Sequence, residues 1–299
     1  MSLRTISVVI PCYRHANDLT RCLAGLAAQV VEVAFEVIVV NSAADPAVAA
    51  AATEGGARLV ESQGRLLPGP ARNLGATHAL GEVLAFIDAD CVPEPGWLAA
   101  AWTARKAGAR LVSGPVLHAL PLHPIAVSDN LLQFADFPGN RPDGAARYFA
   151  GCNLAISRAD FERVGGFPDR SLPAGEDTVF CAAVLACWPD GLQFKRAMRV
   201  RHTGRTTFGA FLDHHATFGY CRGALDLHLS PWHRTWGAHR LMAPPVAAKR
   251  LSYILGRGAQ WDWGQLARTL LLLPIVLPGL FAWAAGFRRG LQATARAGQ

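Results

Sequence analysis

The sequence has few charged residues and none of the repeating patterns that define several protein classes. Charged side chains make up 17% of its 299 residues and apolar side chains 51%, whereas soluble domains average about 25% charged. It contains no internal repeat and no low-complexity tract. These features exclude a disordered chain, a collagen and a charged coiled coil. The length, near twice the ~150 residues of one domain, predicts one large domain or two smaller ones with a real core.

The cysteine patterns of metal sites and disulfide frameworks are also missing. The seven cysteines include no C-x-x-C pair, and their number is odd. This excludes a zinc ribbon and a disulfide scaffold, and it predicts reduced thiols of the kind found in the cytosol. We expect no signal peptide, because Met1 lies almost directly before a strand-like apolar run at residues 6–10.

Acidic residues are scarce in the C-terminal third. Residues 196–299 hold 14 Lys and Arg against 3 Asp and Glu, whereas residues 1–195 hold 15 against 19. A segment this basic needs an anionic partner, and the two candidates are nucleic acid and an anionic membrane face.

One long uncharged run, at residues 269–287, favours the membrane. A helix of 19 residues spans about 28 Å, close to the ~30 Å hydrocarbon core. Pro274 and Pro278 lie inside the run, so a span and a re-entrant or interfacial hairpin both remain open. The alternative is the buried core helix of a soluble protein.

Tryptophans near basic residues support the same interpretation. Trp232, Trp236, Trp261 and Trp263 have the composition of a membrane interface. The basic flanks of the uncharged run are similar on both sides and give no orientation. We expect a protein of the inner or cytoplasmic membrane, with its catalytic domain facing the cytoplasm.

The first half of the chain alternates between apolar runs and helical patterns. Strands are predicted at residues 6–10, 36–40, 58–60 and 83–87. Helices are predicted after caps at Asn17 and Asp18, over residues 46–53, and from Gly69 with Pro70 in the first turn. This alternation predicts an α/β fold, a mostly parallel sheet with helices on both faces.

The second half is less regular. We expect a strand over residues 149–156, a short helix capped by Ser157, and helices over residues 176–187 and 208–222. The last of these could form part of an acceptor wall.

Two carboxylates follow the predicted strand at residues 83–87, in the segment Asp88-Ala89-Asp90. Ligands of open α/β sheets bind beyond the carboxyl ends of strands. Two carboxylates on such a turn can bind one hard cation, Mg²⁺ or Mn²⁺, together with substrate phosphates. The ordinary alternative is an exposed acidic turn.

Three further positions carry candidate chemistry. Arg72, at a helix start, is placed to donate to a phosphate. Glu176 and Asp177 open another helix, whose dipole keeps carboxylates ionised and suited to act as a base. His202, at the end of a basic strand, can complete a metal shell or contact a phosphate. Each has a structural alternative alone, but together they indicate transfer from a diphosphate-activated donor.

Several segments appear in an order that resembles the family 2 glycosyltransferases, which have the GT-A fold. They are ISVVIPC at 6–12, residues 36–40, ARNLG at 71–75, GEVLAFIDADC at 81–91, GCNLAI at 151–156, VGGF at 164–167 and GEDT at 175–178. The resemblance covers about residues 5–205. It is specific to the family, though not to one substrate.

The resemblance implies a role for each donor-side position. Asp90 would be the direct metal ligand, with Asp88 nearer the ribose or sugar and Ala89 between them at the donor. Arg72 would lie near the donor, and His202 would complete the metal or diphosphate site. Pro11 and Tyr13 would line the nucleobase pocket.

On the acceptor side, the resemblance implies that Asp177 is the catalytic base of an inverting displacement, with Glu176 beside it. Asn41 stands where the family usually has an aspartate that contacts the base, so a UDP-, GDP- or dTDP-linked donor remains open. The Q-x-x-R-W signature of processive synthases is absent, so single-sugar transfer is expected.

We therefore expect a catalytic domain at residues 1–205, a basic acceptor-side region at 206–265, and a membrane segment with a basic tail at 266–299. The predicted activity is metal-dependent inverting transfer of one sugar to a hydroxyl or phosphate. The acceptor is expected to be lipid or lipid-linked, in cell-envelope glycan or glycolipid synthesis. The oligomeric state is left open.

Three other functions explain the sequence less well. A sugar nucleotidyltransferase needs a glycine-rich loop, and residues 11–15 contain no glycine. A nucleic-acid-binding protein leaves the acidic motifs unexplained, so no nucleic-acid partner is expected. A catalytically inactive membrane scaffold is opposed by the presence of Asp88, Asp90 and Asp177.

Overall fold

The computed structural model describes residues 5–169, 173–225 and 239–297. Trp232 and Trp236, expected at a membrane interface, lie outside these ranges. The chain divides into two compact units. The first comprises Met1–Ala119, Arg141–Ser171 and Glu176–Thr203, and the second Leu120–Asn140, Leu172–Gly175 and Gly204–Gln299. The predicted boundaries at residues 205 and 265 stay predictions.

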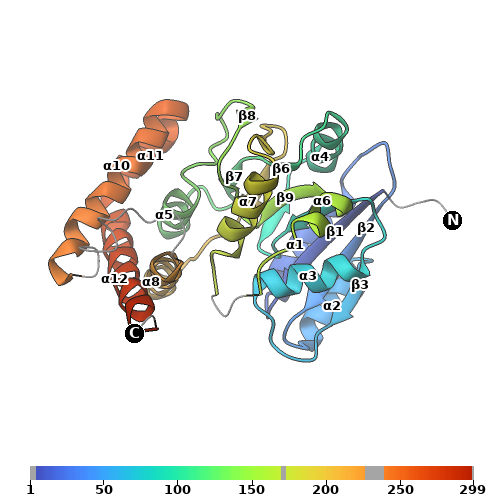
Figure 1. Ribbon diagram of the computed structural model, residues 1–299, viewed down its shortest axis with the longest axis horizontal. Helices are drawn as coiled ribbons and strands as arrows, with labels where there is room; N and C mark the ends of the chain where they lie inside the picture. The colour runs from blue at the N-terminus through green and yellow to red at the C-terminus, as the bar shows by residue number, and fades with distance from the viewer. Residues whose placement is uncertain (1–4, 170–172, 226–238, 298–299) are drawn as a thin grey trace. The chain divides into compact units, whose positions relative to one another are not determined.

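The first unit is built on a large mixed sheet (Figure 1). Its strand order is β3 (Arg58–Glu61), β2 (Phe35–Asn41), β1 (Ile6–Cys12), β4 (Val83–Ile87), β9 (Asn153–Ser157), β6 (Leu111–Ser113), β10 (Leu192–Phe194) and β8 (Gly144–Ala145). The strands β3, β2, β1 and β4 are parallel, and β9 runs antiparallel to both β4 and β6. The predicted α/β class is confirmed.

The order of these strands places the helices on both faces. Crossovers between parallel strands are right-handed. Along the chain, β2 is added beside β1 and β3 beside β2, in the same direction across the sheet. The connecting helices α1 (Ala16–Ala27) and α2 (Pro46–Glu54) therefore lie on the same face and pack together. The step from β3 to β4 goes the other way and puts α3 (Pro68–His78) on the opposite face. The direction reverses between β1 and β4, which is where such folds bind ligands.

A small second sheet lies within the same unit. It contains β5 (Cys91–Pro93), β11 (Val200–His202) and β7 (Val116–His118) in that order. The remaining helices of the unit are α4 (Trp97–Lys106), α6 (Arg158–Arg163) and α7 (Glu176–Cys187). The register pairs His202 with Cys91, directly after Asp90. The two sheets therefore bring distant parts of the chain to one place.

The predicted starts of two helices and one strand are wrong. The helix α1 begins at Ala16 after His15, so Asn17 and Asp18 are not its caps. The helix α3 begins at Pro68, two residues before Pro70. The strand expected from residue 149 starts only at Asn153, because the backbone before it turns to donate from Gly151 to a carboxylate.

The second unit is helical. It contains α5 (Pro124–Gln133), α8 (Phe208–Ala224), α10 (Ala243–Trp261), α11 (Trp263–Leu271) and α12 (Leu273–Ala297), with a short 3₁₀ turn, η1 (Arg240–Met242). Apolar side chains of α5, α8, α10 and α12 form its core. Glycines let α8 and α12 touch closely: a Cβ on Gly286 would lie 1.9 Å from the carbonyl oxygen of Ala216.

The uncharged run at residues 269–287 is divided between α11 and α12. Within the described ranges, no single helix combines the length and apolar character needed to cross a bilayer. The pair formed by α11 and α12 meets that condition together, but the two helices are bent by 87°.

Candidate active site

The site lies at the carboxyl ends of β1 and β4, the strands between which the sheet reverses direction. Pro11 is one of the last two residues of β1, Tyr13 follows the strand, and Asp88 follows β4 directly. Ala89 is buried in the turn, whereas the side chains of Asp88 and Asp90 retain partial exposure. Because β1 pairs with β4 in parallel, the end of the first strand and the acidic turn lie at the same edge of the sheet.

Arg72 lies buried between two acidic side chains. Its guanidinium is 1% exposed and donates through Nη1 to Oε1 of Glu176 and through Nη2 to Oδ1 of Asp88, both at 2.6 Å. Burial opposes the charge, but the two carboxylates raise the pKa of Arg72 above its ordinary value. The side chain predicted to lie near the donor therefore has both terminal nitrogens bound to carboxylates.

Close packing fixes Arg72 in this position. Gly75 of α3 lies against β1, where a Cβ would be 2.3 Å from Cγ1 of Val9. Asn73 donates to the backbone carbonyl of Phe167 at 2.8 Å and accepts from its N–H at 2.9 Å. A Cβ on Gly151 would lie 2.9 Å from Nη2 of Arg72, so only glycine fits over the guanidinium.

Donor groups of three residues, Tyr148, Gly151 and Thr178, hold Asp177. The Tyr148 hydroxyl and the Gly151 N–H donate to Oδ2 at 3.0 and 3.1 Å, and the Thr178 N–H donates to Oδ1 at 2.7 Å. Burial raises the pKa of Asp177, and these hydrogen bonds oppose the rise by stabilising the ionised form. Tyr148 contacts a predicted site residue but was not predicted itself, because no spacing rule connects it to the helix at residue 176.

Glu176 differs from Asp177 in its partner. Burial and the neighbouring Asp177 raise the pKa of Glu176, while its ion pair with Arg72 opposes the rise. The Glu176 carboxylate is thus occupied by a cation, whereas Asp177 is bound by neutral donors only. Of the two predicted residues, Asp177 is the one suited to accept a proton.

Asp90 and His202 form a second pair. Nε2 of His202 lies 3.4 Å from Oδ2 of Asp90, and the Thr203 N–H donates to the Asp90 carbonyl at 3.0 Å. Among the described residues, no group of three or more His, Cys, Asp and Glu could hold a metal ion. One carboxylate and one imidazole fit a cation that takes its other ligands from substrate phosphates.

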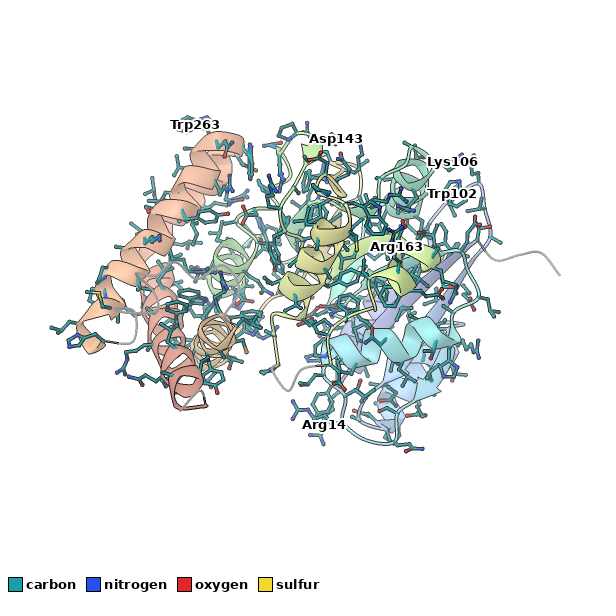
Figure 2. All side chains as sticks on the ribbon, in the orientation of Figure 1. Arg14, Trp102, Lys106, Asp143, Arg163 and Trp263 are labelled. Carbon is teal, nitrogen blue, oxygen red and sulfur yellow. The ribbon has the colours of Figure 1, made fainter. Side chains whose placement is uncertain are left out.

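Tyr13, one of the residues predicted to line the nucleobase pocket, contacts two arginines. Arg65 and Arg14 lie over the Tyr13 ring, with guanidinium carbons 4.5 and 5.2 Å from its centroid; Arg14 is labelled in Figure 2. Arg65, on the loop after β3, is a second residue that the sequence did not single out.

Asn41, the last residue of β2, is fully buried and bonded to the turn that follows it and to Glu61 of β3. Its amide nitrogen donates to the Asp45 carbonyl at 3.0 Å and to Oε1 of Glu61 at 3.1 Å, and its Oδ1 accepts from the Asp45 N–H at 3.1 Å. The amide has two hydrogens, and both are used. Donation from Asn41 to a nucleobase would require one of these bonds to break.

Buried thiols near the site stay protonated. Burial raises the pKa of Cys12 to about 11. A hydrogen bond with Cys152, together with burial, raises the pKa of Cys91. A thiolate nucleophile at these positions is therefore excluded at neutral pH.

Comparison with protein families agrees with this geometry. The model described as Glycosyl transferase family 2 matches residues 7–164, just over half of the chain. The curated glycosyltransferase AglE of Haloferax volcanii is 27% identical over 210 residues, which cover 63% of this chain and 68% of that protein.

Solved structures share the fold at low sequence identity. The mannosyltransferase PcManGT of Pyrobaculum calidifontis, in complex with GDP-Man and Mn²⁺, superposes with a TM-score of 0.58 at 19% identity, covering 97% of this chain and 86% of that one. GalNAc-T7 with UDP, GalNAc and Mn²⁺ gives 0.53 at 16% identity, over 74% and 50% of the two chains. Residues 1–349 of S. aureus TarS give 0.53 at 15%, over 99% and 92%.

Proposed function

Because the chain belongs to glycosyltransferase family 2, we propose that it transfers one sugar from a nucleoside-diphosphate sugar, with inversion, to a hydroxyl or phosphate acceptor. The observation that carries this proposal is the linkage of the two acidic motifs. Arg72 joins Asp88, which follows β4, to Glu176, the neighbour of Asp177 at the start of α7. One guanidinium thereby links Asp88, on the proposed donor side, to Glu176, on the proposed acceptor side.

Asp177 is proposed as the base for a hydroxyl acceptor. The acceptor oxygen forms a bond to the anomeric carbon and its proton passes to Asp177. The bond from the anomeric carbon to the diphosphate oxygen breaks, and its electron pair leaves with the nucleoside diphosphate. Tyr148 and Gly151 orient the Asp177 carboxylate through Oδ2, so Oδ1 faces the helix start and Oδ2 the turn at residues 148–151.

Asp88 and Asp90 are proposed to bind the donor. A divalent cation held by Asp90 and His202 would supply positive charge against the leaving diphosphate. The Mn²⁺, GDP-Man and UDP named for the structural neighbours support Mn²⁺ or Mg²⁺ and a GDP- or UDP-linked donor as the first to test. Ala89, buried between the two aspartates, keeps the turn compact.

The acceptor is proposed to be lipid or lipid-linked. The basic C-terminal third and the apolar pair α11 and α12 support this proposal. They also support location at an anionic membrane. The cytoplasmic face of the inner or cytoplasmic membrane and a role in cell-envelope glycan or glycolipid synthesis are proposed together with such an acceptor.

A donor panel tests the proposed reaction. Detergent-solubilised protein is incubated with UDP-, GDP- and dTDP-sugars in Mn²⁺, Mg²⁺ or EDTA, and release of nucleoside diphosphate is measured. We expect one donor to be turned over with metal and not with EDTA, and Asp90→Ala to remove the signal. Failure of every donor to bind or react with metal present would reject the proposal in favour of an inactive scaffold.

A further inference from the structure

The helix α11 buries its two uncharged polar side chains and exposes three of its large apolar ones. Gln265 and Thr269 are 9% and 1% exposed, and the Thr269 hydroxyl donates to the Gln265 carbonyl. Trp263, Leu270 and Leu271, on the opposite face, are 73%, 50% and 78% exposed; Trp263 is labelled in Figure 2. A water-facing helix has the reverse pattern, so this face is built for apolar surroundings.

The exposed apolar face continues onto the first turns of α12. Leu277 and Phe281 are 39% and 48% exposed, and Pro274 is also exposed. Positions three and four apart share one side of a helix. We name this set the elbow surface: Trp263, Leu270, Leu271, Pro274, Leu277 and Phe281. On the same side of α12, the next turns carry Arg288 and Arg289 instead of apolar residues.

Positive side chains predominate on α10, α11 and α12, although Asp136, which follows α5, contacts Tyr253 and Arg257 of α10. Lys249 of α10, Arg268 of α11 and Arg289 of α12 are exposed. Residues 239–297 contain a single acidic residue, Asp262, and its carboxylate caps α11 by accepting from the Gln265 N–H at 3.1 Å. A second copy of this chain would bring like charges together, whereas anionic lipid headgroups would complement them.

We propose that the elbow surface inserts into one leaflet of an anionic membrane, with α11 and α12 entering and leaving on the same side. The bend of 87° separates a nine-residue helix from the longer α12. Nine residues of helix rise about 13 Å, less than half of the ~30 Å hydrocarbon core. The inference deepens the membrane location proposed above, but it stands on a surface of the second unit alone.

Vesicle flotation tests the surface without requiring catalysis. Purified protein is mixed with preformed vesicles of phosphatidylcholine alone or with phosphatidylglycerol. We expect flotation with the mixed vesicles that weakens at high salt. The double variant Leu270→Glu/Leu271→Glu should bind at least about tenfold more weakly, because it places charge in the apolar layer.

A matched control separates this effect from loss of fold. Val30→Glu adds one negative charge at an 84% exposed apolar residue of the first unit and should float like the wild type. Donor turnover and circular dichroism of each variant report folding independently. Equal flotation of the double variant and the wild type would overturn the proposal. So would a wild-type dimer in lipid-free solution that the double variant converts to a monomer, since a second copy would then cover the elbow surface.

A labelling experiment distinguishes one-leaflet insertion from a span. Ala295→Cys is introduced at an exposed position of α12, in a background with the exposed Cys187 changed to serine. Protein bound from outside to intact mixed vesicles is treated with a membrane-impermeant maleimide. Full labelling is expected, whereas protection until detergent is added would show that α12 crosses the bilayer.

Discussion

Arg72 has almost no contact with water, and two carboxylates neutralise it. Removing one partner of a buried ion pair leaves charges without compensation, which costs about 3–5 kcal/mol. Lysine keeps the charge but cannot donate to two carboxylates through a planar fork. The bridge between Asp88 and Glu176 therefore depends on the guanidinium itself.

We expect Arg72→Lys to lower kcat by about 10²-fold, because misplacement of catalytic groups by about 1 Å has that effect. Steady-state kinetics with the donor identified by the panel would measure it. Arg163→Lys, at an exposed arginine of α6 (Figure 2), should leave kcat unchanged. A wild-type kcat in Arg72→Lys would show that the bridge has no role in the reaction.

Tyr148 sets the pH range in which Asp177 is ionised. Burial raises the pKa of Asp177, and donation from Tyr148 counters the rise. In Tyr148→Phe the ionised form loses a donor, so the pKa rises further. With a hydroxyl acceptor, activity requires ionised Asp177, so the acid limb of kcat/KM should move to higher pH by about one pH unit.

The matched control is Tyr253→Phe, which removes a tyrosine–aspartate hydrogen bond in the second unit. It should not move the acid limb. A pH profile of Tyr148→Phe that overlays the wild type would argue against Asp177 as the titrating base.

At the scale of elements, the sequence predicted long strands well and short ones poorly. The strand β4 was found because its five residues are all apolar and buried, and β1 and β2 because they contain three and four consecutive apolar residues. The strand β3 was found although only one of its four residues is buried. The strands β5, β6, β7 and β10 have three residues each, too few to show a period. The helix α5 was also missed, because its buried residues include Ser128, Asp129 and Asn130, which disguise its apolar face.

In the candidate site, motifs that are local in sequence could be predicted, whereas contacts between distant residues could not. Asp88, Asp90, Glu176 and Asp177 were located because each pair is local in sequence. The contact of Arg72 with both motifs joins residues 16 and 104 positions apart, and no local pattern encodes it. Asn41 was placed at the nucleobase from the resemblance alone, and its bonds to Asp45 and Glu61 could not be foreseen.

Glycine contacts decide how closely α8 and α12 pack. Gly286→Ala should lower the free energy of unfolding by about 1–3 kcal/mol or more, because its Cβ would overlap the Ala216 carbonyl. Chemical denaturation would measure the loss. Gly256→Ala in α10 adds a methyl where no atom lies within 4 Å, and it should be neutral or stabilising by up to about 1 kcal/mol. Equal stability of the two variants would contradict this packing.

At the scale of the whole molecule, the candidate active site and the elbow surface belong to different units. All the predicted site residues lie in the first unit, and the elbow surface lies in the second. The basic excess lies mainly in the second unit, which holds 11 Lys and Arg against 5 Asp and Glu, whereas the first unit holds 18 against 17. Donor chemistry and membrane contact can therefore be altered by separate substitutions.

Donor binding is assigned to Asp90 and proton transfer to Asp177, and measurements on three proteins test both assignments. The dissociation constant of the donor and the rate of nucleoside diphosphate release are measured in Mn²⁺ for wild type, Asp90→Ala and Asp177→Asn. We predict that Asp90→Ala loses donor affinity, while Asp177→Asn binds the donor like the wild type and transfers no sugar to a hydroxyl acceptor. Wild-type transfer by Asp177→Asn, or unchanged affinity in Asp90→Ala, would contradict the assignment.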